Sequence, residues 1–210
     1  MPDDPQYQFW NAAFAGPQFY YGFEPGPVAR RAVRYHRPLW KTEAPSALDI
    51  GCGEGQDLMF LAQTGYDATG LEWTQSGADK ARRLLENNGL KAEVSVADWR
   101  EYSFDRTFDL VLAVNALQFM GEGAAQGLDK IIAAVAPQGV LGLSLFERAR
   151  NQEPIRGGVA FFTMSELLAR FDFTGEDRQW QMLETARLWQ WNRQTNAPQA
   201  FITLVAQRRK

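Results

Sequence analysis

The chain has 210 residues, 45% of them hydrophobic, with a formal net charge of −3 and a pI near 5.3. This length and hydrophobic share support one sizeable core, so we expect a single domain over residues 1–210. The acidic balance, with no basic run before residues 208–210, argues against nucleic acid as a partner. With Cys52 and His36 as the single cysteine and histidine, we expect neither a disulfide framework nor a metal site.

Hydropathy predicts no membrane partner. No apolar run in the sequence reaches the length of a membrane span, and the first residues, Met-Pro-Asp-Asp, do not resemble a signal peptide. We therefore predict a cytoplasmic protein, either a monomer or a homodimer.

The aromatic N-terminal segment, residues 1–24, is the first unit in chain order. Its eight aromatic side chains follow no clean period, and so many rings are expected to be buried. They either pack on the domain as a cap or line a pocket; Tyr20 and Tyr21 are candidates to contact a substrate. A helix is expected from Val28 toward Trp40, and it carries His36. An exposed or core-edge histidine is the preferred interpretation, with a general base as the alternative.

Residues 46–55 are the most informative stretch. The apolar run 47–50 predicts a buried strand, glycines follow at 51, 53 and 55, and the spacing of residues 58–62 is helical. A strand, a glycine turn and a helix start are therefore expected. Such a turn lets the backbone approach a ligand closely, and the helix directs free N–H groups into it.

Two ligand classes use such a turn. The dinucleotide pattern G-x-G-x-x-G requires a glycine at position 56, where this chain has Gln56. Asp49, two residues before the first glycine, would repel a pyrophosphate but accept a hydrogen bond from an ammonium group. Leu-Asp-Ile-Gly-Cys-Gly-Glu-Gly resembles the first motif of class I S-adenosylmethionine-dependent methyltransferases, whose loop wraps the methionine end of the cofactor. The resemblance implies cofactor contacts from Asp49, Gly51, Cys52 and Gly53; the alternative is a purely structural turn.

Two further strand ends carry acidic residues. Residues 67–72 read as the second strand, and Glu72 falls where nucleotide-binding α/β folds place the carboxylate for ribose hydroxyls; the alternative is a solvated loop acid. Trp73 would cover one adenine face. Residues 92–96 alternate as a third strand leading to Asp98 and Trp99. The resemblance implies that Asp98 receives the adenine amino group, while a turn cap is the alternative.

The central strand is predicted over residues 108–114, a nearly continuous apolar run. Its carboxyl end delivers Asn115 and Phe119 toward the sulfonium and the acceptor. An apolar stripe through Leu128 and Val135 predicts the next helix, and residues 140–146 predict a fifth strand that ends at Glu147.

The last third is predicted to close the sheet. Residues 149–162, including Phe162, read as a long loop that could act as a lid, and Thr163 to Glu166 matches a capping box. Residues 180–191 and 201–206 predict two strands joined by a turn over 192–198. The fold class is α/β: a Rossmann-like, mostly parallel seven-stranded sheet flanked by helices, with a closing antiparallel hairpin.

Within the class, residues 158–167 before Phe171, and the late hairpin, resemble the tellurite-resistance methyltransferase family called TehB. That family has a His-Arg pair near the start of its hairpin, where this chain reads Leu-Trp-Gln-Trp over residues 188–191. We therefore carry no catalytic residue across, and the catalytic residues remain unassigned.

The predicted function is methyl transfer from S-adenosylmethionine to a small-molecule acceptor by in-line displacement. Tyr20, Tyr21, Phe119, Glu147 and Phe162 are the candidate substrate contacts. Glu147 or His36 could serve as a base if the acceptor needs one. The alternatives are an NAD(P)-dependent oxidoreductase and a non-catalytic S-adenosylmethionine-binding module.

Overall fold

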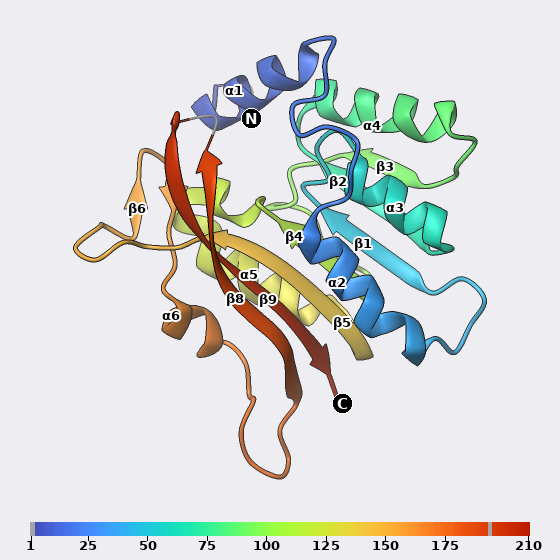
Figure 1. The fold of residues 1–210 in the computed structure, drawn as a ribbon, viewed down its shortest axis with the longest axis vertical. Helices are drawn as coiled ribbons and strands as arrows, with labels where there is room; N and C mark the ends of the chain where they lie inside the picture. Colours follow the sequence, from blue (N-terminus) through green and yellow to red (C-terminus); the bar gives the residue numbers. More distant parts are fainter. Residues whose placement is uncertain (1–2, 193–194) are drawn as a thin grey trace.

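A seven-stranded sheet forms the centre of the computed structural model, which describes residues 3–192 and 195–210. The strand order is β3-β2-β1-β4-β5-β9-β8 (Figure 1). The parallel part consists of β1 (Ser46–Ile50), β2 (Asp67–Glu72), β3 (Glu93–Val96), β4 (Phe108–Val114) and β5 (Val135–Phe146). β8 (Trp180–Asn192) and β9 (Ala197–Arg208) form an antiparallel hairpin, and β9 pairs antiparallel with β5. The predicted α/β class, the mostly parallel sheet and the closing hairpin are confirmed.

Helices cover both faces of this sheet. One face packs against α2 (Pro27–His36), α3 (Gln56–Thr64) and α4 (Gln75–Asn87), and the other against α5 (Ala124–Ala133) and α6 (Met164–Leu168). Two short 3-10 helices are η1 (Arg37–Leu39) and η2 (Leu117–Gly123). Within the described ranges, no helix is long and apolar enough to cross a bilayer.

Local sequence signals set several helix ends. Gly65 ends α3 with a φ of 103°, a left-handed conformation that suits glycine. The Thr74 hydroxyl caps α4 by accepting a hydrogen bond from the amide of Gly77 at 3.2 Å. The capping box predicted at Thr163 and Glu166 is present at the start of α6.

Three local predictions are corrected. The aromatic segment contains a helix, α1 (Pro5–Ala15), which its sequence hides because aromatic side chains point to more than one side. Val135 starts β5 instead of ending the preceding helix, since it pairs with Phe108 on β4. The expected loop 149–162 contains a small hairpin of β6 (Ile155–Arg156) and β7 (Val159–Ala160). Residues 193 and 194 of the predicted turn lie outside the described residues.

The carboxyl ends of β1, β2 and β4 meet at one rim of the sheet, and α1 lies across that rim (Figure 1). α1 packs against α4, and its Trp10 ring contacts Phe119 after β4, with centroids 5.1 Å apart. The chain's first helix therefore covers the place where ligands bind in open α/β sheets.

Candidate active site

A pocket of about 330 Å³ lies at this rim, between the strand ends and the N-terminal segment. Its size is within the range of small-molecule sites. All nine residues predicted to bind the cofactor line it: Asp49, Gly51, Cys52, Gly53, Glu72, Trp73, Asp98, Trp99 and Asn115. These nine residues come from four separate parts of the sequence and are brought to one cavity.

The glycine loop, residues 51–55, is held tightly against its neighbours. The amides of Gly51 and Cys52 both donate to the carbonyl of Leu71, at 2.8 and 3.0 Å. Gly51 has a φ of 69°, and a Cβ there would lie 2.4 Å from the Cβ of Ala116, so a larger residue would not fit. The close approach joins the tips of β1 and β4 and forms the floor of the pocket.

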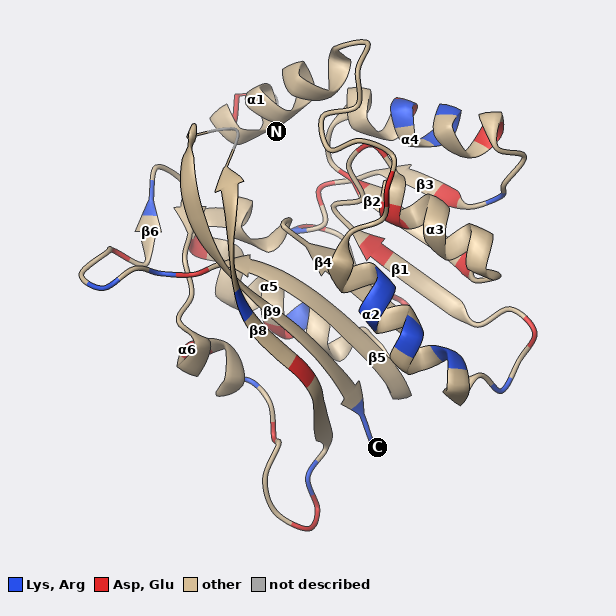
Figure 2. Ribbon diagram, viewed as in Figure 1, with Lys and Arg blue, Asp and Glu red and all other residues tan. Residues whose placement is uncertain are grey.

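Asp49 is a buried acid whose carboxylate is not fully paired within the described part of the chain. It is 2% exposed, and among the described residues its Oδ2 atom has no hydrogen-bond partner. Burial raises its pKa well above the usual value, and the nearby carboxylates of Asp57 and Glu72 raise it further. Figure 2 places acidic residues at the end of β1 and around the glycine loop. A bound cation would satisfy this oxygen and remove the electrostatic cost of ionising it.

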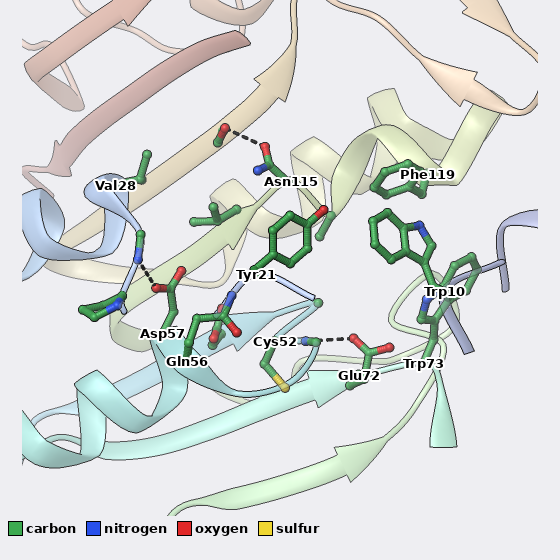
Figure 3. A pocket seen from close by; sticks show the side chains of 18 of the residues that line it. Trp10, Tyr21, Val28, Cys52, Gln56, Asp57, Glu72, Trp73, Asn115 and Phe119 are labelled. Carbon is green, nitrogen blue, oxygen red and sulfur yellow. Dashed lines mark hydrogen bonds between the residues drawn. The ribbon is translucent and has the colours of Figure 1, made fainter. Parts of the chain in front are cut away.

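Glu72 ends β2 and points across to the glycine loop (Figure 3). Its carboxylate accepts hydrogen bonds from the Gly53 amide at 3.0 Å and from the amide and hydroxyl of Thr74 at 2.8 and 2.6 Å. Burial raises its pKa, and these hydrogen bonds act in the opposite direction. Glu72 is therefore an ordered pocket acid and not a solvated loop residue.

Asp98 is engaged by Arg100. The Arg100 Nε lies 2.8 and 2.9 Å from the two carboxylate oxygens of Asp98. Burial opposes ionisation of Asp98, but the hydrogen bonds and charge of Arg100 outweigh it and hold the pKa below its usual value. The same guanidinium lies 5.3 Å from the ring centroid of Trp73, so acid, base and indole form one wall.

Cys52 and Asn115 complete the central part. Burial raises the pKa of the Cys52 thiol well above its usual value, so it stays protonated and acts as a packing group. Asn115 has a φ of 56°, uncommon for a residue other than glycine, and its side-chain oxygen accepts a 2.7 Å hydrogen bond from Ser144 on β5 (Figure 3).

The N-terminal segment is tied to the loop and helices around the pocket. A buried ion pair joins Lys80 on α4 to Glu54 in the glycine loop at 2.6 Å. Lys80 also donates to the carbonyl of Gln18 at 2.6 Å, and Glu54 accepts from the amide of Tyr20 at 2.7 Å. Further along, the Gly26 amide donates to Asp57 at the start of α3, at 2.6 Å. We call the Lys80–Glu54 pair and its two backbone contacts the clamp.

Two of the five predicted substrate contacts, Tyr21 and Phe119, line the pocket. Tyr20, Glu147 and Phe162 are not among its lining residues. Tyr20 packs on Trp10 behind Tyr21, and Glu147 forms an ion pair with Arg187 at 2.6 Å. Phe162 is buried in the core beside α5 and α6. The structure thus does not bring these three predicted residues to the wall of the pocket.

His36 is also outside the pocket. It is buried rather than exposed, and its Nδ1 lies 2.8 Å from the hydroxyl of Tyr66. Burial lowers its pKa, against the opposing effect of the Asp109 charge. The described structure therefore gives His36 a place in the core and none near the reacting end of the pocket.

Sequence reasoning missed several lining residues, chiefly Trp10, Asp57, Leu188, Gln190 and Thr203. Asp57 lies two residues after the last glycine of the motif, and its place in the first turn of the predicted helix was a readable signal. Leu188 and Gln190 are two residues apart on β8 and therefore point to the same face of the sheet. Which face that is depends on the pairing of β8 with β9, which the sequence does not reveal.

Comparison with known proteins gives a consistent result. Residues 47–139 match the family model described as "Methyltransferase domain". A ubiquinone biosynthesis O-methyltransferase from Rickettsia akari is 25% identical over 124 residues, 59% of this chain and 48% of that protein. A cypemycin N-terminal methyltransferase from a Streptomyces species is 30% identical over 155 residues, 73% of this chain and 54% of that protein. The chain thus spans about half the length of these two relatives.

Solved structures share the fold. TehB from Haemophilus influenzae superposes with a TM-score of 0.74 at 15% identity, covering 90% of this chain and 64% of that one. The N-methyltransferase NodS from Bradyrhizobium japonicum, in complex with S-adenosylhomocysteine, gives 0.69 at 16% identity and covers 99% and 100%. At these identities the likeness establishes the fold.

Residues 47–139 thus contain a methyltransferase domain, and the chain has the fold of class I S-adenosylmethionine-dependent methyltransferases. The residues present fit the cofactor of this class. One cavity is lined by a glycine loop that leaves no room for a Cβ, by the Asp49 carboxylate, whose Oδ2 has no partner among the described residues, and by a second strand-end acid, Glu72.

Proposed function

We propose that the protein transfers a methyl group from S-adenosylmethionine to a small-molecule acceptor by in-line displacement. The observation that carries the proposal is Asp49, a buried carboxylate that opens onto the pocket next to a close-packed glycine loop and has no partner for Oδ2 among the described residues. An ammonium group satisfies such an oxygen, whereas a pyrophosphate would be repelled by it.

In this proposal the side chains bind and orient. Asp49 accepts a hydrogen bond from the methionine ammonium, Glu72 accepts from ribose, and Asp98 with Trp73 holds the adenine. S-adenosylmethionine supplies a methyl group on a sulfonium sulfur, which is already a good leaving group. Because little activation is needed, proximity and orientation can provide much of the acceleration, about 7–11 kcal/mol in favourable cases. No general base is assigned.

In this proposal the aromatic N-terminal segment closes the part of the pocket where the methyl group is transferred. Tyr21 lies in the middle of the pocket view, between Asp57 and Phe119, and Trp10 lies above Trp73 (Figure 3). Rings at these positions exclude water and provide apolar walls for the acceptor. The names of the two relatives given above indicate an oxygen acceptor for one and a nitrogen acceptor for the other. They therefore do not decide which atom of the acceptor is methylated here.

A turnover assay tests the proposal. The protein is incubated with S-adenosylmethionine carrying a labelled methyl group and with panels of amines, phenols and thiols, and both labelled product and S-adenosylhomocysteine are measured. We expect the two to form in equal amounts, and Asp49→Ala to abolish both. Tight S-adenosylhomocysteine binding with no transfer to any class would favour a binding module, and hydride transfer from a nicotinamide would favour an oxidoreductase.

A further inference from the structure

The acceptor end of the pocket is the part that remains when the proposed cofactor residues are set aside. It combines the N-terminal segment, the start of α2 and the antiparallel strands. Its main side chains are Trp10, Tyr21, Val28, Ser144, Gln190 and Thr203. Ser144 and Thr203 are directly paired across β5 and β9, so both point to the same face of the sheet.

The titratable side chains on the pocket wall are mostly acids. Among the described lining residues, the acids are Glu24, Asp49, Asp57, Glu72 and Asp98, and the single base is Arg100. Arg100 stands at the cofactor end, where it is bound to Asp98 at 2.5 Å and to Asp4 at 3.4 Å. No described Lys, Arg or His lines the acceptor end.

Nearby cations outside the wall are already paired. Arg30 binds Glu24 at 3.0 Å, which also neutralises that acid, and Arg31 binds Glu184 at 2.9 Å behind α2. Arg187 binds Glu147 at 2.6 Å. Asp57, in contrast, is buried and accepts a hydrogen bond from the Gly26 amide, with no ion-pair partner in the described part of the chain. Burial raises the pKa of Asp57, and a cation bound at the acceptor end would stabilise its ionised form.

The aromatic wall favours the same sign of charge. Trp10 and Tyr21 are stacked with their planes 28° apart and centroids separated by 6.1 Å, and Phe119 meets the Trp10 ring at 68°. The faces of such rings attract cations, and tryptophan does so most strongly. Rings and carboxylates together form the kind of surface that recognises an ammonium group.

We propose that the acceptor is an amine, an inference that rests on the proposed function. The nitrogen lone pair forms the new C–N bond while the C–S bond breaks and its electron pair goes to sulfur. An acceptor that binds as an ammonium first loses one proton to water, which frees this lone pair, and the product is a methylated ammonium. Positive charge moves from sulfur to nitrogen but stays inside the pocket, where ionised acids and the faces of the aromatic rings stabilise it before and after transfer.

The same pocket would disfavour the binding of an anionic acceptor. A carboxylate, thiolate or oxyanion would have to leave water for a wall that offers acids and no free cation. The His-Arg pair of the TehB family is absent from β8, where Leu188 and Gln190 face the pocket instead. The same positions therefore offer a direct way to reverse the preference.

The test uses three matched probes, phenethylamine, phenylethanol and phenylpropionate, with the S-adenosylhomocysteine-loaded protein for binding and the S-adenosylmethionine-loaded protein for turnover. We expect the amine to bind most tightly and to be methylated. Gln190→Lys should weaken amine binding about tenfold and improve carboxylate binding. Trp189→Lys adds the same charge at a 74% exposed position on the other face of β8, and it should change neither.

The outcomes separate the two proposals. If the wild-type protein prefers the carboxylate or the alcohol, or does not bind the amine while it binds S-adenosylhomocysteine, the amine assignment is wrong. Equal effects of the two lysine variants would also overturn it. Failure to bind S-adenosylhomocysteine at all would instead contradict the proposed function itself.

Discussion

The amide of Gly53 donates a 3.0 Å hydrogen bond to the carboxylate of Glu72, and this contact joins the glycine loop to the end of β2. The other oxygen of the same carboxylate accepts hydrogen bonds from the amide and the hydroxyl of Thr74, the residue just before α4. Glu72 thus shapes the pocket in addition to any contact that it makes with ribose. Its removal should affect the protein with and without a ligand.

Glu72→Gln tests this double role, because the amide keeps the size of the side chain but cannot accept at both ends. We expect S-adenosylhomocysteine affinity to fall by about 1.5–3 kcal/mol, the usual range for hydrogen bonds to a charged group, together with a lower melting temperature. Calorimetry and thermal unfolding measure the two effects. Asp67→Asn, at the exposed start of the same strand, is the matched control. An unchanged affinity in the Gln variant would remove Glu72 from the cofactor site.

The raised pKa of Asp49 predicts how cofactor binding depends on pH. Burial and the neighbouring acids favour the protonated form in the free protein, whereas an ammonium ligand needs the ionised form. Binding must therefore release a proton, so affinity should increase as the pH rises toward the raised pKa and level off above it. Calorimetric titration of S-adenosylhomocysteine into the protein, in buffers of different ionisation enthalpy, measures the number of protons released on binding. In Asp49→Asn both the proton release and this pH dependence should disappear; if they persist, another group is responsible.

The clamp predicts how strongly the aromatic segment is held. Lys80→Met leaves Glu54 as a buried charge without its partner, since the two side chains are 6% and 0% exposed, and such losses cost about 3–5 kcal/mol. We expect a lower unfolding free energy and faster proteolysis within residues 3–24. Arg82→Met, which removes an exposed ion pair with Asp79 on the same helix, should do neither. Equal protease resistance in both variants would show that the clamp does not hold the segment.

Much of the sheet could be predicted because each strand carries its own signal. β2 and β4 have the expected bounds, since a turn or charged residue limits each apolar run. The nine proposed cofactor residues share the pocket because parallel strands end at the same rim, a consequence of topology.

The remaining features depend on long-range packing. Val135 fits the apolar period of the preceding helix, and its pairing with Phe108 decides otherwise. Trp10 enters the pocket because α1 docks on α4, and no local pattern sets that position. An exposed or core-edge position was expected for His36, but its ring is buried and the hydroxyl of Tyr66 satisfies it in the core.

Titration of S-adenosylhomocysteine and of a nicotinamide dinucleotide into wild-type protein and Asp49→Ala tests the central claim most directly. We predict that the wild type binds S-adenosylhomocysteine and does not bind the dinucleotide. Asp49→Ala should remain folded and lose most of this affinity, because the pocket loses the acceptor for the ammonium group. Tight binding of the dinucleotide alone, or undiminished S-adenosylhomocysteine affinity in folded Asp49→Ala, would contradict the account.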